Sequence, residues 1–482
     1  MNVPDRKVIF RRRPESNIYR MFFWLILILG GIWLIRQVQQ GDVKPLFLPT
    51  ATPTRTAGSY ELEGDAQFTA GKLDAAIKAY QEAVRLDPSN AQVWADLARI
   101  QTYSSTLLVN DADIKTRLAD ALKSAQQAVS LALDDSNTHA ILAFALDWNA
   151  NPSLVDEKQQ QDYLNQAEQE AVRALQLDNN NVRALAFYAE ILVDQQKWTQ
   201  ADQYITQALQ RDPSLMDVHR VKAYVLESGG QYNLAIQEYD QAIAIAPNLT
   251  FLYLRAGANY RTLGFRSQNE DTQKQLFDKS LEYFAKAARI DDQLGVKDPV
   301  PYLSIAKTYS QTGDYFAAAR NVQKALSFQP DKADFYGQLG VIYFKSRNYE
   351  GSIPALMCAV RGCSGEDSCK GRGLDACDTN NAPVTVQGLP LSPNTVVYYY
   401  TYGSVLAALS RRTSNQCAEA TSVLNQIKSQ FGGDPTILKI VNDGLFICES
   451  LSADLTATPA YPTGTPLPLP LVLGTPTPTV GP

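Results

Sequence analysis

Residues 75–90 read AAIKAYQEAVRLDPSN, and altered copies of this stretch recur at residues 235–248 (AIQEYDQAIAIAPN) and 318–331 (AARNVQKALSFQPD). Each copy has a small residue, an aromatic or aliphatic residue four positions later, Ala three positions after that, and Pro five positions further. The Ala of this pattern marks each internal repeat, and we call it the repeat alanine. It recurs as Ala83, Ala128, Ala174, Ala208, Ala242, Ala287, Ala325 and Ala359, at spacings of 45, 46, 34, 34, 45, 38 and 34 residues. The chain therefore has a basic period of 34 residues with insertions of 4, 11 or 12.

A second pattern precedes each of these segments. Apolar residues at i, i+3 and i+7 form one face of a helix, and a small residue at the eighth position of the unit lets two helices approach closely. The Pro that closes a unit cannot continue a helix. Examples are Trp94…Leu97-Ala98, Tyr253…Gly257…Tyr260, Tyr302…Ala306…Tyr309 and Tyr336…Gly340…Tyr343. The sequence predicts pairs of antiparallel helices, and the fixed period argues against an ordinary all-α bundle.

These residues resemble the tetratricopeptide repeat, and the resemblance covers residues 57–360 as eight units. It implies an all-α fold in which two facing helices per unit stack into a right-handed superhelix, as in membrane-anchored repeat proteins of bacterial envelopes. Three units are stretched, near residues 103–113, 149–160 and 265–275, where longer helices and looped-out turns both fit. Further helices are expected at Val396–Leu409, Cys417–Phe431 and Pro435–Leu451, so that residues 396–451 form repeat-like helices and a cap.

An apolar segment, Met21–Ile35, lies near the N-terminus and contains no charged side chain. Six basic residues precede it, whereas Arg36 and Lys44 follow it. This asymmetry predicts a cytoplasmic stub (1–20), a transmembrane helix (21–36) and an exported remainder. A cleaved secretory signal is the alternative, although Gln37–Gln40 offers no small-residue cleavage site. Both interpretations place the repeats outside the cytoplasm, and the first makes the chain a single-pass cell-membrane protein.

The segments flanking the repeats are rich in Pro and Thr. We expect a linker at 37–56 and a disordered tail at 452–482, because such sequences favour extended conformers and cannot form a packed core. Resemblance to envelope stalks suggests glycosylation of the tail threonines. Beyond residue 36 the chain has 37 basic and 48 acidic residues, a balance of about −11 that disfavours nucleic acid as a partner.

All six cysteines lie in the last third of the chain. Cys417 and Cys448 are each about fifteen residues from Gly432-Gly433, so an antiparallel hairpin would bring them together as a disulfide. Cys358, Cys363, Cys369 and Cys377 belong to a Cys-rich insertion (361–395) and its approach, where two further disulfides are expected and three connectivities are open. Zinc is an alternative, but the Cys spacings do not match its usual pairs. The acidic residues nearby lack the spacing of a calcium loop.

The sequence contains no catalytic motif, so we expect no enzyme activity, no cofactor and no metal. His139 and His219, the two histidines, lie in the first helices of different units, where packing or groove-facing roles are expected. Aspartate pairs such as Asp134/Asp135 and Asp291/Asp292 fall at expected caps and turns.

The resemblance implies that first-helix positions 5, 9, 12 and 13 line a concave groove. In this sequence these positions include Arg99, Tyr103, Glu190, Asp194, Arg220, Tyr224, Glu227, Arg261 and Lys307. Their mixture of charges and tyrosines suits peptide or protein partners, and the Lys/Asn set with which some family members clamp a C-terminal carboxylate is missing. We expect a membrane-anchored scaffold for other exported proteins. The alternative is a non-catalytic accessory subunit of an enzyme system that exports or modifies envelope polymers.

Overall fold

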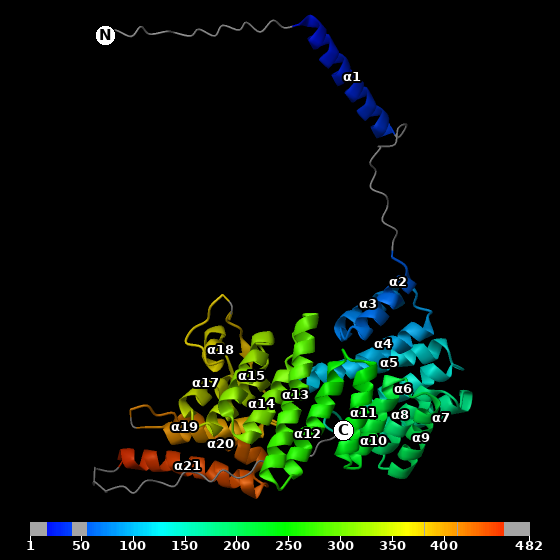
Figure 1. Cartoon of the computed structure of the whole chain (residues 1–482). Coiled ribbons are helices and arrows are strands. Elements are labelled where there is room, and N and C mark those ends of the chain that lie inside the picture. Colours follow the sequence, from blue (N-terminus) through cyan, green and yellow to red (C-terminus); the bar gives the residue numbers. More distant parts are fainter. Residues whose placement is uncertain (1–16, 41–54, 380, 412, 457–482) are drawn as a thin grey trace, which may run out of the picture. The chain divides into compact units, whose positions relative to one another are not determined.

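The computed structural model describes residues 17–40, 55–379, 381–411 and 413–456. It divides into two units, within residues 1–55 and 56–482. Most of the expected cytoplasmic stub, most of the Pro/Thr linker and most of the tail lie outside the described residues. The prediction of an all-α solenoid is confirmed, since almost all regular structure in the described chain is helical (Figure 1).

The first unit contains a single described helix, α1 (Ile18–Gln40), which is longer than the segment expected from composition. Its large apolar side chains between Ile18 and Ile35 are all at least 49% exposed. Residues Ile18–Gln37 are long and apolar enough to cross a membrane, and a signal sequence would meet the same criterion.

The second unit begins with eight pairs of antiparallel helices between Ala57 and Val360, the range expected for eight repeats. The pairs are α2 (Ala57–Thr69) and α3 (Leu73–Leu86), α4 (Ala91–Ser104) and α5 (Asp111–Leu131), α6 (Ser136–Asn149) and α7 (Glu157–Leu177), α8 (Val182–Asp194) and α9 (Trp198–Arg211), α10 (Met216–Ser228) and α11 (Tyr232–Ile245), α12 (Thr250–Arg266) and α13 (Glu270–Leu294), α14 (Val300–Thr312) and α15 (Tyr315–Phe328), α16 (Ala333–Lys345) and α17 (Tyr349–Val360).

The insertions mainly lengthen second helices. α5 and α7 have 21 residues each and α13 has 25, against 14 in α3. A short 3-10 helix, η1 (Ser105–Leu107), and brief turns take up the remaining residues. Of the two alternatives left open by the sequence, longer helices account for most of each stretch.

Small residues set the distance between the two helices of a pair. A Cβ on Gly340 of α16 would lie 2.5 Å from Leu356 of α17, and one on Gly257 of α12 would lie 2.6 Å from Phe284 of α13. These contacts are too short for any side chain, so Gly is required where the larger partner packs. The repeat alanines, Ala83 to Ala359, are at most 1% exposed and fill the same interface.

One recurring hydrogen bond closes the junction between units. The fourth residue of a first helix donates to the carbonyl six residues earlier, at the end of the preceding unit. The indole N–H of Trp94 donates to the carbonyl of Pro88 at 3.1 Å. The hydroxyls of Tyr253 and Tyr336 donate to the carbonyls of Pro247 and Pro330, at 3.0 and 2.8 Å. His139 and His219 occupy the same position and place Nε2 2.9 Å from the carbonyls of Leu133 and Pro213. Both histidines therefore have structural roles.

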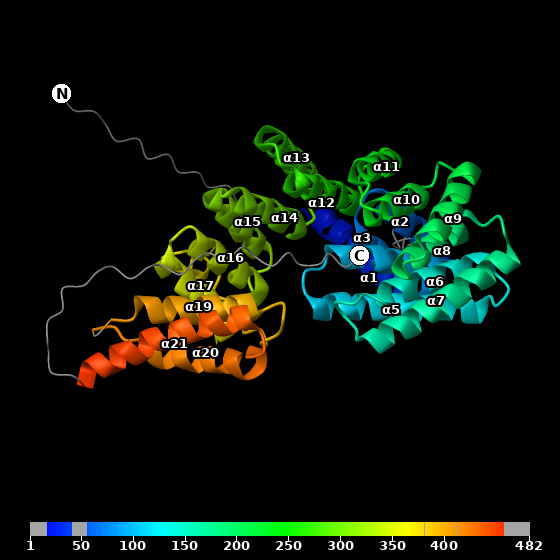
Figure 2. The same cartoon turned by 90° about the horizontal axis from the view of Figure 1, so that it is seen from below.

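The solenoid ends in α19 (Val396–Leu409), α20 (Cys417–Phe431) and the capping helix α21 (Pro435–Thr456). The Cys-rich insertion before them contains the short helix α18 (Gly365–Gly371) and two antiparallel strands, β1 (Gly362–Cys363) and β2 (Val386–Gln387), with Gly362 opposite Gln387. Figure 2 shows α19, α20 and α21 side by side, beyond α16 and α17.

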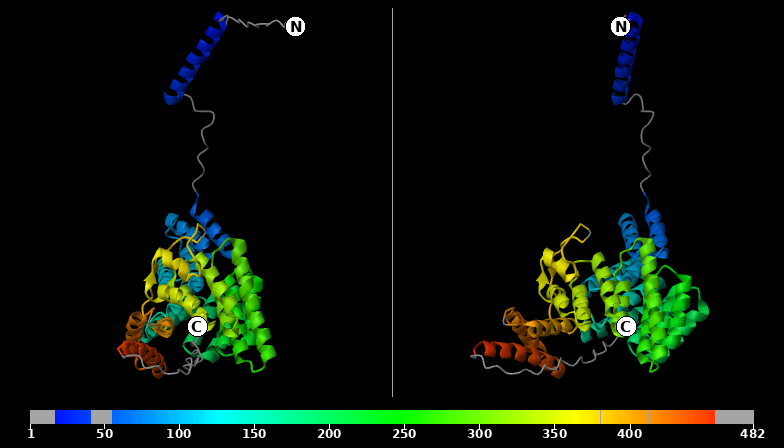
Figure 3. Two further views of the ribbon diagram at one scale, coloured as in Figure 1. Left: turned by 90° about the vertical axis from the view of Figure 1, so that its left-hand side faces the viewer. Right: turned by 60° about the vertical axis from the view of Figure 1, so that its left-hand side comes forward.

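Later repeats of the superhelix contact its first repeats. Lys332, before α16, forms an ion pair of 2.7 Å with Asp113 of α5. The side-chain amide of Asn248, before α12, donates to the carbonyl of Thr69 at 3.2 Å. In both views of Figure 3 the blue helices α2 and α3 lie beside green helices from later repeats.

Candidate binding surface on the inner face

The first helices α4, α6, α8 and α10 pack against one another in chain order and form the inner face of the solenoid (Figure 1). Because the superhelix is tightly wound, side chains on this face meet partners several repeats away. The ring of Tyr103 on α4 stacks on that of Phe251 on α12, with centroids 5.1 Å apart. The inner face of the first five pairs is therefore closed by its own side chains.

A buried ion pair links α4 to α10. The guanidinium of Arg99 approaches the carboxylate of Asp217 at 2.7 Å, and the Tyr103 hydroxyl donates to the same carboxylate. Arg183 lies 3.7 Å from it. Burial acts to raise the pKa of Asp217, but the two arginines and the tyrosine hydrogen bond outweigh it and leave that pKa lowered. The carboxylate thus stays ionised inside the protein.

A second ion pair joins α8 to α10. Arg220 contacts Glu190 through two hydrogen bonds, of 2.7 and 2.5 Å, the bidentate geometry that favours Arg over Lys. Its guanidinium also lies 5.3 Å from the centroid of the Tyr103 ring and 5.4 Å from that of Phe144. Aromatic rings and a carboxylate together surround the charge.

The next carboxylates along the inner face are held by tyrosines and arginines. The Tyr224 hydroxyl donates to Asp194 at 2.5 Å, and Arg255 pairs with Glu227 at 2.9 Å. Burial raises the pKa of Asp194 to about 7. Asp147 lies beside it and is 3% exposed, and burial together with the charges of Asp194 and Glu190 raises its pKa as well.

These contacts use seven of the nine residues expected in the groove. Arg99, Tyr103, Glu190, Arg220 and Tyr224 are each at most 8% exposed, and Asp194 and Glu227 are half-buried. The structure brings the seven together as an internal network rather than as an open groove. Asp217 and Arg255, which complete the network, were missed by the sequence analysis because they occupy other helix positions.

The remaining two expected residues, Arg261 on α12 and Lys307 on α14, are in a different environment. Burial lowers the pKa of Arg261 to about 10. It also lowers the pKa of Lys307, and the charge of Arg261 adds to this effect. Lys345 on α16, at position 13 of its unit, was omitted from the expected set, and burial lowers its pKa too.

Three disulfides fix the C-terminal part. Cys417 is bonded to Cys448 with Cα atoms 5.3 Å apart, joining α20 to α21 as the hairpin argument predicts. Cys358 is bonded to Cys363 and Cys369 to Cys377, one of the three connectivities left open. All six thiols are used, so the cysteines provide no zinc ligands.

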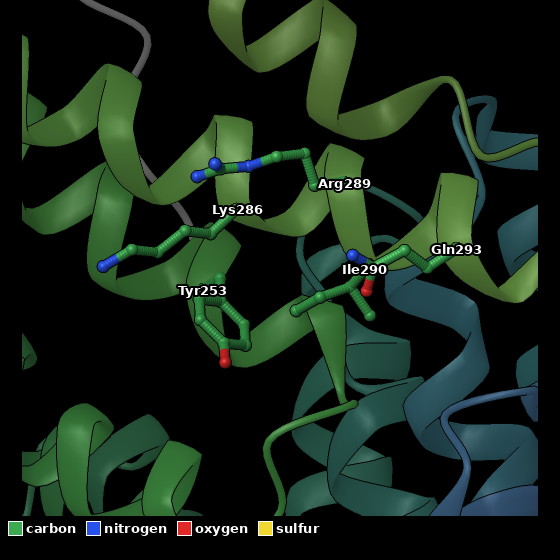
Figure 4. Close-up of a pocket in the computed structure, with 5 residues that line it drawn as sticks. All are labelled: Tyr253, Lys286, Arg289, Ile290 and Gln293. Carbon is green, nitrogen blue, oxygen red and sulfur yellow. The ribbon is translucent and has the colours of Figure 1, made fainter.

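Two of the hollows in the part of the chain that the structure describes have their lining residues on α12, α13 and the C-terminal part. One of about 210 Å³ is lined by Tyr253 of α12 and by Lys286, Arg289, Ile290 and Gln293 of α13, and Figure 4 shows Lys286 and Arg289 extending to the same side. The other, of about 430 Å³, lies between Tyr343 and the Cys-rich insertion at Lys370 and Asp375. Among the described residues no group of three or more His, Cys, Asp or Glu is arranged to hold a metal ion.

Comparison with known proteins gives the following. The family model described as "TPR repeat" matches residues 64–101, and the model described as "Tetratricopeptide repeat" matches residues 188–250. No curated protein matches the sequence. The solved structures with a similar fold include TTC0263, a thermophilic TPR protein of Thermus thermophilus, at 18% identity over 42% of this chain and 98% of that one, with a TM-score of 0.35. Human IFIT1, solved as a dimer with PPP-AAAA, is 16% identical over 84% of this chain and 92% of that one, with a TM-score of 0.49.

Proposed function

Because this chain is a tetratricopeptide-repeat protein, we propose that it is a protein-binding scaffold, tethered to a membrane by α1 and folded outside the cytoplasm. Repeats of this kind imply protein–protein interaction rather than catalysis. In line with this, the ion pairs of Arg99 with Asp217, Arg220 with Glu190 and Arg255 with Glu227 hold one repeat to another.

The observation that carries the proposal is the set of three disulfides. Their Cα atoms lie 4.7, 5.4 and 5.3 Å apart, within the range that a disulfide requires. Cys417–Cys448 joins α20 to α21 and Cys358–Cys363 joins α17 to β1, and the elements of both pairs are packed together. Disulfides persist in oxidising compartments and are rare in the cytosol. A domain stabilised in this way is suited to the outside of the membrane.

The tether is supported by α1. Its apolar side chains are exposed to a degree that water disfavours and a lipid bilayer favours. The basic residues that precede it in the sequence favour a cytoplasmic N-terminus. With a single tether and export of the rest, the solenoid would face partners in the envelope or beyond.

The test is crosslinking on intact cells that produce the full-length chain, using an amine-reactive crosslinker that cannot cross membranes. We expect adducts between this chain and a second protein without permeabilisation, while a cytoplasmic marker protein stays unmodified. If adducts form only after permeabilisation, the proposed location is wrong. If the chain is modified from outside but forms no adduct with another protein, the scaffold role is wrong.

A further inference from the structure

The segment that joins α4 to α5 is longer than a helix pair requires. The first and fourth pairs use three-residue turns, at 70–72 and 195–197, whereas residues 105–110 form a connection of six residues, three of them in η1. This connection contains Leu107, Leu108 and Val109, although turns are usually built from small and polar residues. We call residues 105–110 the bridging loop.

The bridging loop contacts helix pairs that lie far from it in the sequence. Leu107 is partly buried against an apolar cluster on α12, α13 and α14, and Val109 against a second cluster on α14 to α17 and β2. Tyr309 on α14 packs against both clusters, so the apolar surface beneath the loop is continuous. The first cluster consists of Tyr253, Leu254, Phe284, Ala287 and Ile305.

The backbone of the loop explains why both side chains face this surface. Leu108, between them, has extended dihedral angles, with φ −96° and ψ 151°. In an extended backbone, residues i and i+2 point to the same side, so Leu107 and Val109 reach the sixth to eighth helix pairs together. The loop therefore lies on this apolar surface as a short extended peptide would.

One ion pair holds the end of the bridging loop. Lys332, before α16, contacts the carboxylate of Asp113 on α5 at 2.7 Å, and the side-chain amide of Asn110 donates to the same carboxylate at 2.6 Å. The side chains of Lys332 and Asp113 are 24% and 48% exposed, so water and salt weaken the pair. The hydrogen bonds of the loop itself stay between Thr102 and Ile114, and among the described residues none reaches the later pairs.

These contacts make the bridging loop easy to detach. Residues 106–110 are all partly exposed, and a segment with few buried apolar contacts opens at a smaller free-energy cost than the core helices do. When the loop leaves, the apolar surface beneath it meets water, which is unfavourable until another apolar group covers it. An exposed apolar surface of this kind is suited to protein binding.

We infer that the bridging loop is a removable cover over an apolar binding site on the sixth to eighth helix pairs, and that an extended segment of a partner protein binds there in its place. The inference rests on the proposed scaffold function and specifies the binding site and the chemistry of the partner. The loop itself shows that chemistry, because it supplies two aliphatic side chains at i and i+2 and, four residues later, a carboxylate for Lys332. The free protein is therefore self-inhibited, since the partner competes with the loop.

The chain's own tail is a poorer occupant than a partner. Its aliphatic run at residues 471–473 (LVL) is followed by no acidic residue up to residue 482. Asp454, the one charged residue in 452–482, lies before this run. The tail therefore lacks the carboxylate that Lys332 receives from Asp113.

The inference is tested with the full-length chain in detergent micelles. The probe is a fluorescein-labelled peptide with the sequence of residues 104–113 (SSTLLVNDAD), and the control peptide has Ser at the three aliphatic positions. The uncovered variant is Leu107→Ser combined with Val109→Ser. Its control is Leu133→Ser, which removes a leucine side chain that is 66% exposed. A third variant, Asp113→Asn, weakens the ion pair and leaves Lys332 free for the peptide. Fluorescence anisotropy measures binding, and circular dichroism checks folding.

We expect the uncovered variant to bind the peptide about tenfold more tightly than the wild type or Leu133→Ser does, with Asp113→Asn in between. The control peptide should bind none of them. Equal affinity of the wild type and the folded uncovered variant, or equal affinity for the two peptides, would overturn the inference. If the uncovered variant does not fold, Asp113→Asn decides, and an affinity equal to that of the wild type would overturn it.

Two further results separate the alternatives. Tighter binding of a peptide of residues 464–473 than of the loop peptide would assign the site to the chain's own tail and overturn the assignment to a partner. In the crosslinking experiment on intact cells, the uncovered variant should give more adducts than the wild type, because no loop competes with the partner. If the peptide fails to bind while adducts still form, the scaffold function stands and the removable cover is wrong.

Discussion

Arg99 and Asp217 are 118 positions apart in the sequence and form an ion pair of 2.7 Å in which both side chains are less than 10% exposed. The pair joins α4 to α10 across the intervening repeats. Tyr103 bonds to the same carboxylate and stacks on Phe251, so one cluster connects three first helices. The inner face of the N-terminal repeats thus holds the superhelix closed, and binding is left to other surfaces.

Replacing Asp217 by Asn should destabilise the solenoid strongly, because Arg99 would remain buried, and Arg183 partly buried, beside a neutral side chain. Breaking a buried pair in this way costs about 3–5 kcal/mol. Asp202→Asn is the matched control, since Asp202 pairs with Lys222 at 2.6 Å but is 59% exposed, and such pairs contribute about 0–1 kcal/mol. Urea unfolding followed by circular dichroism measures both. Equal shifts in the two variants would show that the buried pair does not hold the superhelix closed.

Raising the pH from 5 to 8.5 should lower the melting temperature. Burial and the nearby charges of Asp298 and Asp292 raise the pKa of Asp291 to about 8, and burial raises that of Asp298 to about 7. A group whose folded pKa is raised stabilises the fold below its unfolded pKa, about 4 for Asp, and this contribution is lost as the pH rises through the folded value. His219 adds to the trend, because its hydrogen bond to Glu238 raises its pKa.

The double variant Asp291→Asn, Asp298→Asn measures what these two carboxylates contribute to the pH dependence, beside Asp194 and Asp147, whose pKa values are raised as well. Asp291 and Asp298 are at most 4% exposed and each has an oxygen with no hydrogen-bond partner. The neutral amides should therefore flatten the profile and raise the melting temperature at pH 8. An unchanged slope between pH 5 and 8.5 would contradict this assignment.

Gly340→Ala should destabilise the eighth helix pair, because the added Cβ would lie 2.5 Å from Leu356. Such overpacking typically costs about 1–3 kcal/mol. Gly433→Ala is the control, since nothing lies within 4 Å of a Cβ placed there. Hydrogen exchange resolved by segment should show faster exchange in α16 and α17 of the first variant only. Unchanged exchange there would mean that the helices are not in close contact.

Replacing Cys417 and Cys448 by Ser should loosen the C-terminal cap alone. The bond closes a loop of about 30 residues between α20 and α21, and its loss costs about 3 kcal/mol. Because α20 and α21 pack mainly against α19 and against each other, hydrogen exchange should rise in α20 and α21 and stay unchanged in α2 to α13. Chelators should have no effect on the wild type. Loss of protection throughout the solenoid would contradict a locally acting disulfide.

The helices were predictable because their signals are local. The repeat alanine, the small residue at position 8 and the closing Pro all act within one 34-residue unit. The helices α19 and α20 match the predicted ranges Val396–Leu409 and Cys417–Phe431. Cys417 and Cys448 were paired correctly for the same reason, since the two arms of one hairpin determine the contact.

The role of the inner face was not predictable in this way. Helix positions 9 and 13 place Arg99 and Tyr103 on the inner side, but whether that side is open depends on how far the superhelix winds. The winding is the sum of small rotations between many repeats, including three with lengthened helices. Only the structure shows that Asp217 reaches Arg99, and that Arg261 and Lys307 have no comparable partner.

The most direct test of the account is non-reducing peptide mapping of the full-length chain from membranes isolated with a thiol-blocking reagent present throughout. Folding outside the cytoplasm predicts three linked pairs, Cys358–Cys363, Cys369–Cys377 and Cys417–Cys448, with no cysteine blocked as a free thiol. Blocked thiols at all six positions would contradict the proposed location and remove the main support for an exported scaffold.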